Sequence, residues 1–179
     1  GYHTFELFFD DCRISSKKVL GEVGKGWNVA NEWLTAGRVM VAANCVGQAQ
    51  RALDASISWS ADRNQFGKPI GTNQGISFKL ADMATEIRAA DLLTLHAAQK
   101  MDLGTMTDAD AGMAKLFASE VLGRAVDEAV QIYGGMGLMD EAPIERMWRN
   151  ARIERRWEGT SEIQRHIISR ELLGPYLKR

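Results

Sequence analysis

Residues 157–165 read WEGTSEIQR, and this stretch predicts a loop that leads into a helix. Ser161 and Gln164 have the spacing of a capping box, in which the hydroxyl accepts a backbone N–H and the glutamine reaches back to the helix start. Gly159 permits a tight turn or the close approach of a ligand. Glu158 is therefore expected just ahead of a helix N-terminus, beside a large aromatic residue.

Glu158 has two interpretations on these residues alone. A carboxylate in a partly apolar pocket can act as a general base. A glutamate near a helix cap can also be an ordinary solvated residue, and the nine residues by themselves favour this second interpretation. The remainder of the chain is needed to decide between them.

The composition of the 179 residues is that of an ordinary globular protein, with 45% hydrophobic and 25% charged residues. A length of 179 residues is enough for one domain with a core. The net charge of −1 gives no reason to expect nucleic acid or an anionic membrane as a partner. Cys12 and Cys45 form no C-x-x-C pattern and are interpreted as reduced thiols of an intracellular protein. The histidines form no metal-ligand pattern, and no apolar run approaches the ~18 residues of a membrane span.

Residues 1–22 differ in pattern from the rest of the chain. Residues 4–9 read TFELFF, which favours a short strand, and residues 19–22 favour a second extended piece after a polar turn. Two strands alone are marginally stable in water. We therefore expect the chain to be a fragment whose partner strands lie elsewhere in a longer protein or in another chain.

Five helices are expected after the glycine-rich break at residues 24–26. The first runs from Trp27 to about Arg63, and apolar residues at helical spacing give it one buried stripe. These residues are Trp27, Ala30, Leu34, Val41, Cys45 and Ala49. The other four helices are expected at residues 74–103, 107–133, 143–152 and 161–173. Gly174 and Pro175 are expected to end the last one.

Short loops between these helices predict an all-α fold, an antiparallel up-and-down bundle of three long and two shorter helices with a short β segment at the N-terminus. Thr107 or Asp108 is expected to cap the third helix. No internal repeat or low-complexity segment is present in the sequence. No Glu-x-x-His motif is present either, which argues against a four-helix metal protein.

Two turns are candidates for binding a phosphate or a flavin. Gly134 and Gly135 end a helix rather than follow a strand, which excludes a Rossmann fingerprint but leaves open a close approach to a phosphate or ribityl chain. Arg63 and Phe66 flank a tight turn, where an arginine can bind phosphate and an aromatic ring can pack on a flavin or adenine. Taken alone, the first turn is a helix terminator and the second an exposed turn with a core-facing Phe66.

In their order and spacing, these elements resemble the acyl-CoA dehydrogenase family over nearly the whole chain. The matching stretches are residues 24–26, 38–43, Arg63, Phe66, Gly67, Pro69, Ile70, Gln74, residues 79–83, 114–115, 131–137, 149–153 and 158–160. The resemblance implies that residues 1–22 are the end of the family's middle β-domain. Residues 23–179 would be its C-terminal helical domain.

The resemblance implies a flavin enzyme that desaturates an acyl-CoA thioester between Cα and Cβ. Glu158 would remove the α-proton while a hydride passes from Cβ to FAD. The backbone N–H of this glutamate would polarise the thioester carbonyl as negative charge develops, and Gly159 would keep that backbone accessible. Arg38 would lie near the reacting end of the substrate.

The resemblance also implies how FAD is held. Thr160 and Glu162 would lie along the cofactor of their own subunit. The residues expected to contact the adenosine diphosphate half of FAD from a neighbouring subunit are Arg63, Phe66, Gln74, Gln131, Gly134 and Gly135. A shared site implies a homo-oligomer, either a tetramer or a dimer. Electrons would pass to an electron-transfer flavoprotein, in the cytoplasm of a bacterium or the mitochondrial matrix of a eukaryote.

Two positions bear on the base and the substrate. Some members of the family, including branched-chain ones, carry the glutamate on the long helix just before the arginine, and here that position is Gly37, which cannot act as a base. Trp157 stands where a smaller aromatic or an aliphatic residue is common, so it is a candidate for setting the preference for acyl chain length.

Two other functions remain open. An acyl-CoA oxidase would use the same base and flavin but would pass electrons to oxygen. A helical assembly module without catalysis would be unaffected by Glu158→Gln. The 179-residue chain alone is expected to have little or no dehydrogenase activity.

Overall fold

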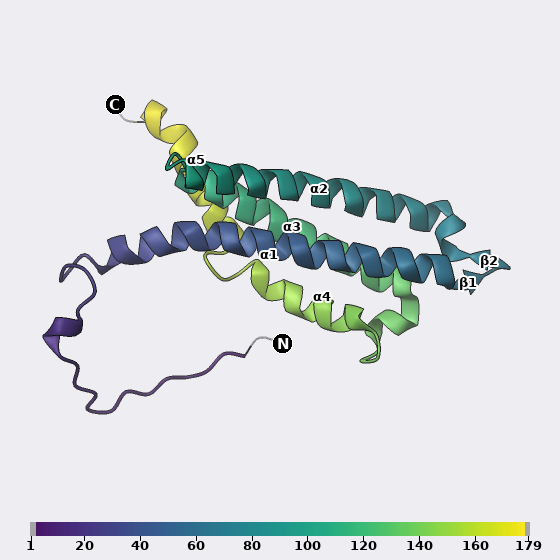
Figure 1. Cartoon of the computed structure of the whole chain (residues 1–179), viewed down its shortest axis with the longest axis horizontal. Coiled ribbons are helices and arrows are strands. Elements are labelled where there is room, and N and C mark those ends of the chain that lie inside the picture. Colours follow the sequence, from purple (N-terminus) through teal and green to yellow (C-terminus); the bar gives the residue numbers. More distant parts are fainter. Residues whose placement is uncertain (1–2, 178–179) are drawn as a thin grey trace.

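The computed structural model describes residues 3–177. Within them the chain forms five α-helices, and the first three are long and run up, down and up beside one another (Figure 1). The helices are α1 Gly26–Asp62, α2 Gln74–Asp102, α3 Asp108–Tyr133, α4 Pro143–Glu154 and α5 Ser161–Leu177. The predicted bundle of three long and two shorter helices is confirmed.

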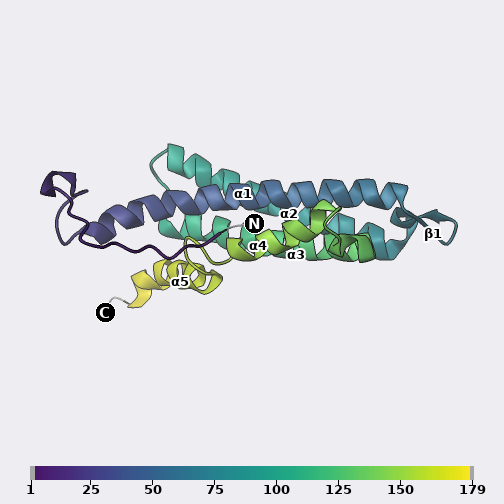
Figure 2. The same cartoon turned by 90° about the horizontal axis from the view of Figure 1, so that it is seen from below.

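The third helix, α3, is the central element of the bundle. It packs against each of the other four helices, and its most extensive contact is with α1. Both α4 and α5 lie to one side of α1 (Figure 2), where they pack on α3. The loop that joins α4 to α5 is therefore anchored to α3 at both of its ends.

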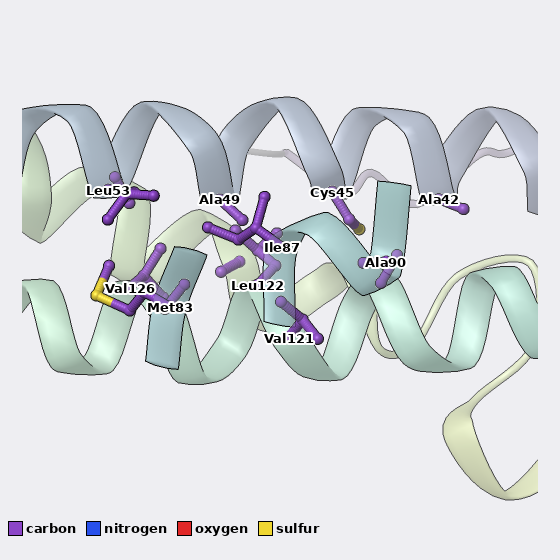
Figure 3. Packing of buried hydrophobic residues seen from close by; sticks show 14 of the residues in the cluster. Ala42, Cys45, Ala49, Leu53, Met83, Ile87, Ala90, Val121, Leu122 and Val126 are labelled. Atoms are coloured by element: carbon purple, nitrogen blue, oxygen red, sulfur yellow. The ribbon is translucent and has the colours of Figure 1, made fainter. Parts of the chain in front are cut away.

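The core where α1 meets α3 contains many small side chains. Ala42, Cys45 and Ala49 follow one another at helical steps of three and four residues, and each is completely buried. Figure 3 shows the α1 side chains above those of α3, with Ile87 of α2 beside Leu122. Small residues allow the two helices to approach closely. None of the helices in residues 3–177 is long and apolar enough to cross a membrane.

The buried stripe of α1 is shorter than its sequence predicts. Trp27 is 72% exposed and Ala30 is also exposed, so their expected place in the core is wrong. Burial begins at Gly37, and Val41 is only partly buried. The reason is geometric, because the start of α1 extends beyond the ends of α2 and α3 (Figure 1). An apolar stripe is buried only where a partner element runs beside it.

The expected strands near the N-terminus do not form in the described residues. Residues 3–15 and 19–25 adopt no strand, and only the short 3₁₀ turn η1, Ser16–Lys18, interrupts them. The segment is exposed throughout, and with no neighbouring strand its backbone gains no ladder hydrogen bonds. The prediction for residues 1 and 2 lies outside the described residues.

The two strands of the described chain lie instead between α1 and α2. They are β1 Asn64–Gln65 and β2 Lys68–Pro69, an antiparallel pair in which Asn64 is opposite Pro69. Phe66 and Gly67 form the turn between them, both with positive φ (53° and 79°). A further 3₁₀ turn, η2 Ile70–Thr72, leads into α2.

The last helix continues past its predicted end. α5 runs to Leu177, through Gly174 and Pro175, instead of stopping near Leu173. Proline has a φ that suits a helix, and its missing N–H removes only the bond to the carbonyl of Glu171. Glu171 is exposed, so water can satisfy that carbonyl and the helix does not need to end.

Candidate active site

The turn between α4 and α5, residues 155–160, has an unusual backbone. Glu158 has a φ of 52° and Gly159 a φ of 98°, both in the left-handed region that L-amino acids avoid. A Cβ at Gly159 would lie 2.7 Å from Nε2 of Gln164, so this position requires glycine. Strained conformations at non-glycine residues cluster at active sites. The backbone at Glu158 therefore marks the turn as a candidate site.

Three side chains from three helices hold the carbonyl groups of this turn. Arg38 of α1 donates from Nε to the Glu158 carbonyl at 3.4 Å. Lys115 of α3 donates from Nζ to the Gly159 carbonyl at 2.8 Å. Gln164 of α5 donates from Nε2 to both carbonyls at 3.0 Å. The strained turn is thus fixed by hydrogen bonds from the surrounding bundle.

The predicted capping box at the start of α5 is wrong. Thr160, one residue earlier, accepts the N–H of Ile163 at its hydroxyl oxygen (3.4 Å). Ser161 is buried and donates to Oε1 of Glu120 at 2.8 Å. Gln164 is completely buried and acts as a donor to the turn. Both side chains stabilise tertiary structure because they point into the bundle, which local spacing could not reveal.

Arg38 carries a buried positive charge next to the turn. Its side chain is 5% exposed, and Nη1 lies 3.6 Å from Oδ1 of Asp108 at the start of α3. Burial lowers the pKa of Arg38, and the charges of Asp108 and Glu158 act in the opposite direction. The arginine therefore links the turn to the N-terminus of α3. Its expected place near the reacting end of the substrate stays a prediction.

The side chain of Glu158 lies against Gly37 of α1. A Cβ at Gly37 would be 3.6 Å from Cγ and 3.9 Å from the carboxyl carbon of Glu158. Position 37, where some family members carry the glutamate, is therefore adjacent in space to Glu158. Glycine at position 37 leaves room for that carboxylate.

A buried carboxylate anchors the beginning of the turn. Glu154, the last residue of α4, is completely buried, and its Oε1 accepts from Asn44 at 3.1 Å and Gln48 at 3.2 Å. Its Oε2 accepts the indole N–H of Trp157 at 2.8 Å. This bond fixes the orientation of the aromatic ring next to Glu158.

Neither Glu154 nor Lys115 was singled out as a site residue from the sequence. For Lys115 a signal was present, because the lysine interrupts the apolar face formed by Ala111, Ala114 and Ala118. A charged residue on the buried face of a helix needs a polar partner. A similar signal exists for Glu154, because it follows Ile144 and Ala151 on the buried face of α4.

The other predicted site residues gather at the opposite end of the bundle, around the β1–β2 turn and the end of α3 (Figure 1). Arg63, Gly134 and Gly135 line one open hollow of about 610 Å³, whose wall includes Trp59 stacked on Tyr133 with ring centroids 4.7 Å apart. Phe66 is 94% exposed, so the core-facing alternative is wrong. Gln74 and Gln131 are exposed at the adjoining helix ends.

This second group fits a ligand that has both phosphates and an aromatic ring. A Cβ at Gly134 or Gly135 would meet nothing within 4 Å, so the backbone there is open to a close approach. The Nε1 of Trp59 is buried without a hydrogen-bond partner in the described chain. Arg63 supplies a guanidinium beside these groups.

The two groups of site residues are far apart in one chain. Thr160 lies in the turn and Glu162 in the first turn of α5, so both belong with Glu158. Arg38 and Arg63 are on the same helix axis, about 38 Å apart at 1.5 Å per residue. Within residues 3–177 no group of three or more His, Cys, Asp or Glu side chains could hold a metal ion.

The sequence and the fold of this chain are similar to those of known proteins. Residues 24–173 match the family model described as the acyl-CoA dehydrogenase C-terminal domain. An acyl-CoA dehydrogenase of Bacillus subtilis is 47% identical over 97% of this chain and 46% of its own length. The human mitochondrial short-chain specific acyl-CoA dehydrogenase is 45% identical over 98% of this chain and 43% of its own length.

The solved structure of butyryl-CoA dehydrogenase from Megasphaera elsdenii has the same fold. Its TM-score is 0.89 at 44% identity, and the match covers 92% of this chain and 43% of that chain. The chain therefore spans less than half the length of the proteins that it matches.

Proposed function

The chain belongs to the acyl-CoA dehydrogenase family, and from this membership we propose that the whole protein oxidises an acyl-CoA thioester between Cα and Cβ with FAD. The observation that carries the proposal is the clamped turn that holds Glu158 against Gly37 and beside Arg38. Glu158 is the catalytic base that removes the α-proton. The strain at its backbone is the kind that a functional site retains.

The same turn can stabilise the charge that develops on the substrate. Its two carbonyls at Glu158 and Gly159 are occupied by donors from the bundle. Among the described residues the N–H of Glu158 has no acceptor, so it is available to a thioester carbonyl. A backbone N–H directed at developing negative charge is the arrangement of an oxyanion hole. Gly159 keeps this approach free of a side chain.

FAD fits the residues of the second group. Arg63 would hold a phosphate, Gly134 and Gly135 would allow its close approach, and the exposed Phe66 ring would cover a flat ring. Gln74 and Gln131 border the same end of the bundle as hydrogen-bonding groups, and Thr160 and Glu162 would lie along the cofactor near the base. When bound, FAD supplies the acceptor for the hydride from Cβ.

The separation of the two groups supports a site that is shared between subunits. One chain would contribute Glu158, Arg38 and Thr160, and a neighbouring copy would contribute Arg63 and the glycines. This requires a homo-oligomer, a dimer or a tetramer. The exposed segment before α1 is, in this proposal, the end of a middle β-domain.

The substrate and the acceptor are further parts of the proposal. The names of the human relative and of the Megasphaera protein support a short straight-chain acyl-CoA such as butyryl-CoA. Electrons leave the reduced flavin for an electron-transfer flavoprotein. The protein would work in the cytoplasm of a bacterium or in the mitochondrial matrix.

The test is an anaerobic titration of the full-length protein with straight-chain acyl-CoAs of increasing length. The wild type should lose the long-wavelength absorbance of oxidised flavin, most readily with butyryl-CoA. Glu158→Gln should bind FAD but remain oxidised. If the variant is reduced as fast as the wild type, Glu158 is not the base. Rapid reoxidation by oxygen without an electron-transfer flavoprotein would instead favour an oxidase.

A further inference from the structure

Lys115 is a completely buried lysine in the middle of α3. Its Nζ donates to the carbonyl of Gly159, at 2.8 Å, rather than to a carboxylate. Burial of an ammonium group costs several kcal/mol unless other groups compensate for the lost hydration. The position is therefore unfavourable for stability alone, and the hydrogen bond that its ammonium makes within residues 3–177 is to the turn that carries Glu158.

The surroundings of Lys115 are charged on several sides. The titratable groups that face it are Cys45 and Arg38 from α1, Glu154 from α4 and Glu158 from the turn, and α5 contributes the neutral amide of Gln164. Burial lowers the pKa of Lys115, while Cys45, Glu154 and Glu158 act in the opposite direction. The carboxylate of Glu158 is thus one of the charges that favour the ammonium form of Lys115.

The turn is held from both ends by this buried cluster. Glu154 fixes the indole of Trp157, which precedes Glu158, and Lys115 fixes the carbonyl of Gly159, which follows it. The base therefore lies between two anchored residues. A movement of either anchor would rotate the peptide groups on which the N–H and the carboxylate of Glu158 depend.

We infer that Lys115 is a positioning residue for the base. Its hydrogen bond to Gly159 fixes the strained turn, and its positive charge attracts the carboxylate that accepts the α-proton. This inference rests on the proposed function, since it requires Glu158 to be the base. The two effects are separable, because a hydrogen bond and a charge can be removed independently.

Three substitutions in the full-length enzyme separate them, with kcat/KM measured across pH for the best acyl-CoA. Lys115→Gln keeps a donor but loses the charge, so the acidic limb of the profile should move up by about one pH unit. Lys115→Arg keeps the charge, so the limb should stay in place. Lys115→Met loses both, and its plateau should also fall on the order of 10²-fold. Lys79→Met, which removes a lysine paired with Glu128 between α2 and α3, is the control and should leave the limb unmoved.

An acidic limb in Lys115→Gln that coincides with the wild type would overturn the role of the charge. Equal losses in all three variants without any movement of the limb would make Lys115 purely structural. If Lys115→Met does not fold, as judged by circular dichroism, the comparison of Gln with Arg still decides the question. A wild-type protein that binds FAD but is reduced by no acyl-CoA would overturn the proposed function first, and this inference with it.

Discussion

Glu158 and Gly159 are two successive residues with positive φ, and side chains of the bundle hold the carbonyl groups of both. The glycine adopts its conformation at little cost, but the glutamate costs of order 1–3 kcal/mol. Hydrogen bonds to both carbonyls offset this cost. The geometry of the base is thus determined by its backbone as much as by its side chain.

Gly159→Ala should disable the site. The new Cβ would lie 2.7 Å from the amide nitrogen of Gln164 and would force φ away from 98°. We expect a loss of about 1–3 kcal/mol in the free energy of unfolding and a rate of flavin reduction lower by roughly 10²-fold, since small displacements of reacting groups have such effects. Stopped-flow reduction and denaturant unfolding measure the two quantities.

The matched control is Gly174→Ala, at a helical glycine whose Cβ would meet nothing within 4 Å. It should leave the rate unchanged and alter stability by less than about 1 kcal/mol. Equal rates for Gly159→Ala and the control would show that the turn tolerates a side chain.

The contact between Gly37 and Glu158 predicts that the base can be moved. In the double variant Glu158→Gly with Gly37→Glu, the carboxylate would come from α1 and occupy nearly the same space. The removed side chain also relieves the strain at position 158. We expect Glu158→Gly alone to be inactive and the double variant to regain a measurable part of flavin reduction by acyl-CoA.

The acyl chain preference of this double variant should differ from that of the wild type, since the base approaches from another element. A double variant as inactive as Glu158→Gly would mean that the two positions do not reach the same proton.

At the scale of the helices, the start of α3 is the best-defined boundary. The Thr107 hydroxyl accepts the N–H of Asp110, and the Asp110 carboxylate accepts the N–H of Thr107 at 2.9 Å. Both hydrogen bonds of a capping box are therefore present. Lys100 of α2 pairs with the same carboxylate. Burial alone would raise the pKa of Asp110, but the hydrogen bonds from Lys100 and Thr107 outweigh it and lower this pKa below the ordinary value.

Asp110→Asn should therefore destabilise the protein in a pH-dependent way. Because the folded-state pKa is depressed, the ionised carboxylate contributes its full stability above the unfolded pKa of about 3.9 and loses it as the pH falls through the folded value. At neutral pH we expect a loss of about 1 kcal/mol. The difference from the wild type should shrink toward zero in acid.

Urea unfolding at several pH values measures this difference. Asp82→Asn, at an exposed position of α2, provides the comparison and should show a small effect at every pH. A loss for Asp110→Asn that is the same at neutral and acidic pH would contradict the role assigned to its charge.

The sequence predicts the helices themselves, and each prediction that was wrong has a physical reason. Periodicity and a cap at Thr107 or Asp108 predict α3 to within a residue, because these signals are local, and the structure has the cap at Thr107. Trp27 misled the prediction of the core, because burial depends on how far α2 and α3 extend. Ser161 misled the prediction of a cap, because the fold brings Glu120 to its hydroxyl. Gln164 misled it because its amide donates to the carbonyls of Glu158 and Gly159 instead of bonding the start of the helix.

The candidate site shows the same limit. The resemblance implies that Arg38 lies near the reacting end of the substrate, where Glu158 would act, and in the structure Arg38 donates to the Glu158 carbonyl. The support from Lys115 and Glu154 depends on contacts between residues 44 to 110 positions apart in the sequence. No pattern within one helix can reveal which distant carbonyl or amide a buried charge will meet.

At the scale of the whole molecule, the two groups of site residues predict complementation between inactive chains. In a hybrid oligomer of Glu158→Gln and Arg63→Glu chains, one shared site would combine the intact Glu158 of one chain with the intact Arg63 of the other. In a hybrid dimer the other shared site combines both mutated residues, so roughly one site in two should be active. Each variant alone should have almost no activity.

The measurement is acyl-CoA-dependent dye reduction by full-length chains that are co-expressed with different affinity tags and purified through both. The double purification establishes that hybrids have formed. Hybrids as inactive as their parents would mean that each site is built from a single chain.

The three side chains that hold the turn also determine how this protein would lose activity in a living cell. Arg38, Lys115 and Gln164 belong to α1, α3 and α5, so the turn keeps its form only while these three helices keep their relative positions. A packing defect between α1 and α3, such as an enlarged residue at Ala49, would shift the clamp before the bundle melts. Such alleles would be temperature-sensitive: the cell would hold folded enzyme that is inactive when warm and recovers on cooling.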